Sequence, residues 1–309
     1  MRLSANSLKE YTKCGYAFYL KRMLQQPEPG KKSYGMLQGR VMGEAVQQCA
    51  TFLNTNKYLD DAVIGSILAD TYAAEFSKAQ VPQGIEVEIK RLLTVGTSPD
   101  TLESLYLMSP SINCSEFELK IPARLKNGTL SSDKRKPTLG AIVMHAYADL
   151  LWYFEPETYM YCMTRDAVQV EHEYHFTMQM DTDLEVDGYF DQRLHLPDGK
   201  VLVTEFKSDK TAYSQELVNR MIQTVTYQLA SPDDVVQLVD LTHHSIYPIT
   251  ASAQTLTLTS ERYKQTALAL THHIYTPACG TDPFKDKQIL CGYKCGGCPY
   301  GTTEVDEDE

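Results

Sequence analysis

The chain has 309 residues, of which 43% are hydrophobic, and a formal net charge of −11. This length and apolar content suffice for one elaborated domain, or two, with a buried core, and no apolar run approaches the roughly 20 residues that a membrane-spanning helix needs. The first residues, MRLSANSLKEYTKC, lack the apolar stretch of an export signal, so we expect a cytoplasmic protein. The negative net charge is unfavourable for binding nucleic acid, although a local basic groove can still attract DNA.

The amino-terminal half of the sequence reads mainly as helices. Residues 3–26 predict one helix that ends at the PEPG sequence, and helical periodicity dominates from Met36 to about Tyr106. From Leu107 to Arg165 the pattern is mixed, with one helix-like stretch, GAIVMHAYADLLWYF. The basic run from Arg124 to Lys136 is either a patch for DNA or a solvated loop.

The second half predicts a sheet flanked by helices. AVQVEHEYHFTM begins the sheet, and a hairpin follows around Pro197-Asp198-Gly199, where proline and glycine supply the angles of a turn. Next come a helix (SQELVNRMIQTVTYQLA), a strand (VVQLVDLTHHSIYPI) and a last helix (SERYKQTALALTHHIYT). The expected organisation is an amino-terminal helix, a helical region with an insertion, a sheet core, a cysteine segment and an acidic tail, at residues 1–35, 36–165, 166–276, 277–300 and 301–309.

Three ionisable residues flank the predicted hairpin turn. Asp191 lies as far before Asp198 as Glu205 lies after it, so the register places Asp191 and Glu205 opposite each other, and the strand period puts Lys207 on the same face. Facing carboxylates repel each other unless a cation lies between them, and Mg²⁺ or Mn²⁺ prefers oxygen ligands. A metal bound by Asp191 and Glu205, with Lys207 beside it, is an arrangement suited to phosphodiester hydrolysis.

A helix downstream adds two polar side chains to this pattern. Gln223 and Tyr227 share a face of the predicted helix, so they can brace Lys207 or touch a phosphate. A Glu-x-Lys triplet alone is common on solvated strands, and the chain has a second one at Glu118-Leu119-Lys120. That second triplet lacks both a preceding Gly-x-x-Asp strand and a following Gln-x-x-x-Tyr helix, so order and spacing favour the triplet at 205–207.

A second group of reactive side chains lies near the carboxyl end, in LCGYKCGGCPYG. Cys291, Cys295 and Cys298 are three thiols, so a site of four thiolates needs a distant fourth cysteine. Such a site holds an iron–sulfur cluster or structural Zn²⁺. The spacing also resembles the cluster motif of radical S-adenosylmethionine enzymes, and disulfides are the last alternative, which the lack of an export signal disfavours.

Together these motifs resemble the RecB-like nucleases of the PD-(D/E)XK superfamily, including the AddB-type and CRISPR-associated exonucleases that carry an iron–sulfur cluster. The resemblance runs from Leu3 to Tyr300. It implies an α/β fold, the αβββαβ core of that superfamily with a mixed sheet, helical additions and a C-terminal cysteine-cluster module. The matching motifs are Ser7-Leu8, Cys14, Phe18-Tyr19, Gly188 to Asp191, Glu205 to Lys207, and Gln223 to Tyr227.

The resemblance also implies how the cysteines are used. Cys14 stands where the family places its amino-terminal cluster ligand. We therefore expect a [4Fe-4S] cluster held by Cys14, Cys291, Cys295 and Cys298, with Zn²⁺ as the less favoured occupant. Cys279 is an outside candidate for the fourth ligand.

One motif departs from the family. The family has a helix with G-x-x-x-H, whose histidine is a further metal ligand, but GRVMGEAVQQCA carries Gly39 and then Gly43 where the histidine is expected. Glu44 follows immediately and is the candidate substitute, because oxygen ligands suit Mg²⁺ or Mn²⁺. On an ideal helix, however, Glu44 points about 100° away from Gly43.

The resemblance therefore implies a metal-dependent DNA exonuclease that acts on single-stranded or free ends in recombination, repair or phage DNA processing. The expected metal ligands are Asp191, Glu205 and Glu44, and Lys207 is the expected base or phosphate stabiliser. A helicase or recombinase is a possible partner, since the chain has no phosphate-binding loop of its own.

Two other classes of function compete with a nuclease. The first is a nuclease-fold protein that binds DNA or acts as a scaffold, because the missing histidine has abolished cleavage. The second is a cluster protein with a redox or assembly role. The sequence leaves open the polarity of cleavage, exonuclease against endonuclease action, and DNA against RNA.

Overall fold

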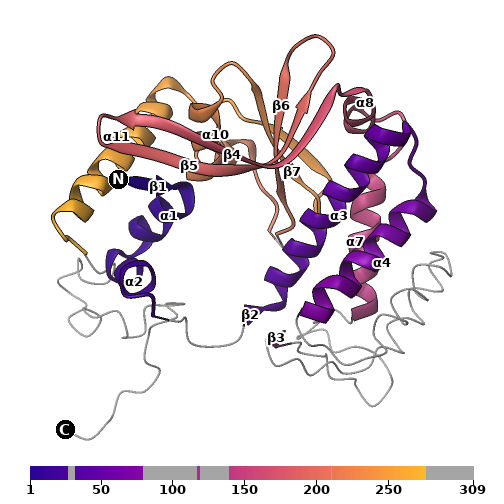
Figure 1. Ribbon diagram of the computed structural model, residues 1–309, viewed down its shortest axis with the longest axis horizontal. Coiled ribbons are helices and arrows are strands. Elements are labelled where there is room, and N and C mark those ends of the chain that lie inside the picture. Colours follow the sequence, from indigo (N-terminus) through magenta and orange to yellow (C-terminus); the bar gives the residue numbers. More distant parts are fainter. Residues whose placement is uncertain (27–31, 79–116, 119–138, 210, 276–309) are drawn as a thin grey trace, which may run out of the picture.

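A computed structural model describes residues 1–26, 32–78, 117–118, 139–209 and 211–275 (Figure 1). In this part of the chain, two groups of helices flank a twisted sheet and cover different ends of its long central hairpin. None of the described helices is both long and apolar enough to cross a bilayer. One group consists of α1 (Ala5–Lys13), α10 (Ile222–Ala230) and α11 (Ala253–Thr271), and the other of α3 (Tyr34–Asn56), α4 (Asp61–Lys78), α7 (Leu139–Tyr153) and α8 (Tyr159–Asp166).

The main sheet has six strands and is mixed, as the sequence predicts. Three strands form an antiparallel meander, β4 (Gln169–Asp181), β5 (Leu184–His195) and β6 (Val201–Lys207). The chain then crosses through α9 (Gln215–Val218) and α10 to β7 (Val235–Asp240), which pairs in parallel with β6. A parallel pair needs such a crossover, so this part follows the expected βββαβ order. The remaining strands are β8 (Ser245–Pro248), β1 (Arg2–Ser4) and the separate short pair β2 (Lys32–Ser33) and β3 (Phe117–Glu118).

The hydrophobic core consists of three clusters that lie along the β4–β5–β6 meander. Beside α3, α4, α7 and α8, one large apolar cluster includes Leu194 of β5 and Leu202 of β6. A second cluster packs Phe176 and Phe190 against Tyr227 of α10. At the turn between β4 and β5, a third cluster packs Leu184 and other residues of β5 against α1 and α11. The β4–β5 hairpin therefore contacts both groups of helices, and the middle of its strands lies between the first and third clusters.

The expectation of one helix over residues 3–26 is wrong. Residues 2–4 form β1, which pairs with β5, and α1 ends at Lys13. Cys14 then has an extended backbone and caps the short helix α2 (Gly15–Phe18), which continues into a π-helical turn (Tyr19–Met23). The amphipathic pattern did predict helical residues, but the pairing of Leu3 with Val186 takes the first residues into the sheet.

Two more elements are divided where the sequence predicts one. The helix expected over SQELVNRMIQTVTYQLA breaks between α9 and α10, where the Thr224 hydroxyl donates to the carbonyls of Val218 and Met221. The strand expected over VVQLVDLTHHSIYPI folds back on itself as β7 and β8, with a turn between Asp240 and Ser245.

Helix boundaries elsewhere follow side-chain caps. Helix α11 begins at Ala253, earlier than expected, because Ser252 accepts a hydrogen bond from the N–H of Thr255. Thr158 caps α8 in the same way, in a region whose sequence pattern is mixed. Several expectations lie outside the described residues: the helical pattern beyond Lys78, the basic run at 124–136, the cysteine segment and the acidic tail.

Candidate active site

The hairpin between β5 and β6 brings Asp191 and Glu205 together in the predicted register. The paired residues include Gln192 with Thr204, so the next position along the two strands sets Asp191 beside Glu205. Gly199 makes the turn with φ +83°, a backbone conformation that favours glycine. The backbone N–H of Phe206 donates to Asp191 Oδ2 at 2.8 Å, which ties the Asp191 carboxylate to the strand that carries Glu205.

A chain of side-chain hydrogen bonds joins four of the five residues singled out in the sequence, all but Asp191. Lys207 Nζ contacts Glu205 Oε1 and lies 3.1 Å from Gln223 Oε1. Gln223 Nε2 donates to Glu205 Oε1 at 2.7 Å and to the Tyr227 hydroxyl at 3.0 Å. Tyr227 in turn donates to the carbonyl oxygen of Tyr189 at 2.6 Å. Helix α10 therefore holds the lysine and the glutamate of β6 from one side.

The two carboxylates carry an electrostatic cost. Glu205 is 1% exposed, and its Oε2 has no hydrogen-bond partner within the described residues. Burial, and then the neighbouring Glu205, raise the pKa of Asp191 well above its usual range, against the lowering effect of the Phe206 N–H. Burial lowers the pKa of Lys207, but Glu205 and Asp191 outweigh that effect, so the lysine pKa is raised.

This arrangement fits a hard divalent cation. A buried carboxylate oxygen without a partner, next to a second carboxylate, is a site that positive charge would stabilise. Within the described residues, however, no group of three or more Asp, Glu, His or Cys side chains is placed to hold a metal ion as it stands. Asp191 and Glu205 alone therefore form an incomplete set of protein ligands.

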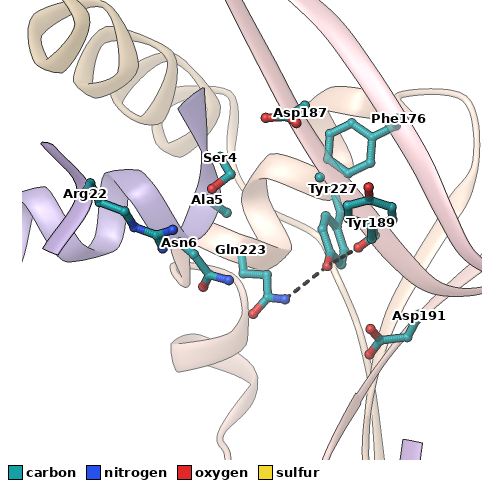
Figure 2. Close-up of a pocket in the computed structure, with 11 residues that line it drawn as sticks. Ser4, Ala5, Asn6, Arg22, Phe176, Asp187, Tyr189, Asp191, Gln223 and Tyr227 are labelled. Atoms are coloured by element: carbon teal, nitrogen blue, oxygen red, sulfur yellow. Dashed lines mark hydrogen bonds between the residues drawn. The ribbon is translucent and has the colours of Figure 1, made fainter. Parts of the chain in front are cut away.

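A pocket of about 420 Å³ opens beside this network (Figure 2). Asp191 and Gln223 line one part of it, and Ser4, Asn6 and Arg22 line another. Arg22 is held by Glu10, whose Oε2 accepts from Arg22 Nε at 2.8 Å. The pocket thus combines the site carboxylate, the start of α1 and an arginine.

Steric crowding explains why the first residue of the Gly-x-x-Asp motif is a glycine. A Cβ at Gly188 would lie 2.7 Å from Cζ of Phe176, so the Phe176 ring leaves no space for a side chain there. Phe176 stacks on Phe190 and meets Tyr227 edge-on. The motif glycine therefore allows the aromatic cluster beneath the site to close.

Comparison with known families agrees with this geometry. The family model of the PD-(D/E)XK nuclease superfamily matches residues 2–303, nearly the whole chain. The chain belongs to this superfamily. No curated protein matches the sequence. The hairpin, the Glu-x-Lys strand and the crossover helix of this PD-(D/E)XK chain are thus the elements that carry the candidate site.

The helix α3 lies over the β4 side of the PD-(D/E)XK site. Gly43 belongs to α3, and a Cβ added there would meet no atom within 4 Å. Glu44 is exposed and accepts a hydrogen bond from Gln48 Nε2 at 2.8 Å. The charge of Glu44 acts to raise the pKa values of His172 and Glu173 of β4. This electrostatic effect is the link between Glu44 and the candidate site.

The proposed cluster ligands are only partly described. Cys14 lies between α1 and α2, partly exposed, and its Sγ accepts from the N–H of Ala17 at 3.4 Å. Cys291, Cys295 and Cys298 lie outside the described residues, as does the alternative Cys279.

Sequence reasoning missed the residues that approach the site from outside the hairpin. Ser4, Asn6 and Arg22 line the pocket, and no spacing in the sequence marks them. Glu173 has a signal that can be read. The polar turn between β4 and β5 is centred near Thr182, and counting back from it places Glu173 opposite Asp191.

Proposed function

We propose that this PD-(D/E)XK chain is a metal-dependent DNA exonuclease that hydrolyses phosphodiester bonds at strand ends. The observation that carries the proposal is the hydrogen-bonded network of Glu205, Lys207, Gln223 and Tyr227 beside Asp191, together with a buried oxygen of Glu205 that has no hydrogen-bond partner within the described residues. Mg²⁺ or Mn²⁺ is the proposed ion, and it would supply a water of lowered pKa and positive charge beside the phosphate.

Each residue of the network has a role in this proposal. Asp191 and Glu205 are the ligands that hold the ion, and Glu44 is a candidate further ligand. Of the two roles expected for Lys207, its raised pKa favours stabilising charge on the phosphate over acting as the base for the attacking water, because the amine stays protonated. Gln223 and Tyr227 are positioning residues, because they hold Lys207 and Glu205 through hydrogen bonds.

The pocket beside Asp191 supports action at an end rather than within a duplex. Its volume of about 420 Å³ suits a small group, such as one terminal nucleotide, and Ser4 and Asn6 of the amino-terminal segment bound it. Arg22, which is ion-paired with Glu10, lines the same pocket. The proposed substrate is therefore DNA with single-stranded or free ends, processed beside a helicase or recombinase.

A [4Fe-4S] cluster held by Cys14, Cys291, Cys295 and Cys298 is part of the proposal. Support comes from the contacts of the last described residues, Ile274 and Tyr275. Tyr11 donates to the carbonyl oxygen of Ile274 at 2.7 Å, and the rings of Tyr19 and Tyr275 are 4.5 Å apart. The segment that carries the three distant cysteines thus starts next to the elements that flank Cys14.

Absorption spectra and iron analysis of anaerobically purified protein test the cluster. Wild type is expected to show the visible absorption of an iron–sulfur protein, and Cys14→Ser to lose it. A cluster that survives in Cys14→Ser would assign the fourth ligand to another cysteine, with Cys279 the first to examine, and zinc without iron would replace the cluster by a structural zinc.

The decisive experiment is Mn²⁺-dependent degradation of end-labelled single- and double-stranded DNA, comparing wild type with Lys207→Ala. Cleavage by wild type alone, lost on chelation, is the expected result, while Lys207→Ala still binds Mn²⁺. The competing function is a DNA-binding protein that no longer cleaves, which the glycine at position 43 favours. Absence of cleavage by both proteins, with DNA binding retained, would establish that function.

A further inference from the structure

Glu173 lies in line with the two site carboxylates. In the β4–β5 pairing, His172 faces Gln192 and Tyr174 faces Phe190, so Glu173 is opposite Asp191. Continuing across β5 to β6, Asp191 is beside Glu205. Three carboxylates therefore occupy the same level of three neighbouring strands.

The backbone at Glu173 is unusual for a strand. Its φ is +47°, in the left-handed region that residues other than glycine rarely adopt. The regular β4–β5 pairing is interrupted at this residue alone between Gln169 and Gln179. Such outliers persist where the surroundings hold them, and they concentrate at functional sites.

Helix α3 contacts Glu173 through a hydrogen bond and leaves open space on the same helical face. Gln47 Nε2 donates to Glu173 Oε1 at 3.2 Å, and Thr51, on the following turn, contacts His172 at 3.1 Å. Gly43 lies one turn before Gln47 on the same helical face, and a side chain at that position would meet no atom within 4 Å. This face of α3 therefore has room next to Gln47.

The charges near Glu173 also fit a cation. Burial raises the pKa of Glu173, and Glu205 and Glu44 add to this effect, while Gln47 opposes it. These carboxylates repel one another, and the buried Glu205 Oε2 among them has no hydrogen-bond partner in the described chain.

We infer that Glu173 is a third carboxylate ligand of the divalent-cation site, supplied by the outer strand of the hairpin, with Gln47 as its positioning residue. This inference rests on the proposed function. The side chain of Glu173 is exposed, and ligation would require it to turn from Gln47 toward Asp191 when the ion enters. Oxygen ligation at this place suits Mg²⁺ or Mn²⁺.

Mn²⁺ binding to the full chain, followed by the electron paramagnetic resonance signal of the free ion, tests the inference without activity. Glu173→Gln keeps the size of the side chain and an oxygen that accepts from Gln47. It is expected to weaken Mn²⁺ binding by about tenfold or more, whereas Glu185→Gln, an exposed carboxylate at the far end of β5, stays within about twofold of wild type. Mn²⁺ affinity unchanged in Glu173→Gln but lost in Asp191→Asn would overturn the inference.

Melting curves in excess chelator separate ligation from a structural role. Because Glu173→Gln removes a repelling charge, its melting temperature without metal should equal or exceed that of wild type. A lower melting temperature would make Glu173 a structural residue and overturn the inference. The proposed function fails separately, if wild type binds Mn²⁺ through Glu173 and yet cleaves no DNA.

Discussion

Replacing Tyr227 by phenylalanine removes one oxygen from the centre of the candidate site. That hydroxyl donates to the Tyr189 carbonyl at 2.6 Å and accepts from Gln223 at 3.0 Å, and Tyr227 is 3% exposed. A net contribution of about 1 kcal/mol for each hydrogen bond, with a further cost for polar groups left buried without a partner, gives a loss of roughly 2–3 kcal/mol in the free energy of unfolding. Gln223 also loses one of the bonds that fix it, so Lys207 and Glu205 are held less firmly.

Two measurements on matched variants separate stability from site geometry. Tyr263→Phe is the control, because Tyr263 is equally buried and its hydroxyl lies 2.9 Å from the Thr226 hydroxyl rather than next to Gln223 or Lys207. Urea unfolding should show a loss in both variants, about 1 kcal/mol in Tyr263→Phe. DNA cleavage by folded protein should fall by about tenfold or more only in Tyr227→Phe. Equal cleavage by Tyr227→Phe and wild type would refute the idea that this network positions the site.

Three further substitutions test local features. Gly43→Ala should raise the free energy of unfolding by about 0.5–1 kcal/mol, because the helix gains a better helix former in open space, and a loss in urea unfolding would mean that α3 is packed closely there. Gly188→Ala should lower it by about 1–3 kcal/mol, since its Cβ would displace the ring of Phe176, and an unchanged unfolding midpoint would contradict that contact. The charges of Lys21 and Arg22 lower the pKa of Glu10 below its ordinary value even though burial raises it, so Glu10→Gln should cost about 0.5–1 kcal/mol near neutral pH. This difference should vanish as the pH falls through the lowered pKa of Glu10, and a difference that persists in acid would exclude the ion pairs as its cause.

The sequence predicts the hairpin at the site because its signals are local. Pro197 and Gly199 mark the turn, and a period of two residues then fixes which side chains of β5 and β6 meet. The spacing of Gln223 and Tyr227 on a helix is equally local. Gln223 and Tyr227 join Lys207 through hydrogen bonds because the chain crosses from β6 to β7 through their helix. Parallel strands need such a crossover, so this arrangement also follows from the predicted order of elements.

Other features depend on contacts that no local pattern encodes. The strand at residues 2–4 follows from the pairing of Leu3 with Val186, far away in sequence. The division between α9 and α10 is stabilised by the Thr224 hydroxyl, a residue type common within helices and at their ends. The left-handed backbone of Glu173 occurs where β4 contacts Gln47 of α3, a contact distant in sequence, so composition gives no warning of it.

The parallel pairing of β1 with β5 also has consequences for how the molecule folds. The Met1 ammonium donates to the carbonyl of Asp183 at 2.6 Å, a contact between residues 182 positions apart in the chain. Contacts of such long range form slowly, because a large loop must close before they gain anything. During synthesis, residues 1–13 leave the ribosome long before β5 exists, so Leu3 and Leu8 have no sheet to cover in that interval. The pocket wall that Ser4 and Asn6 supply therefore takes its place only after β5 has been made.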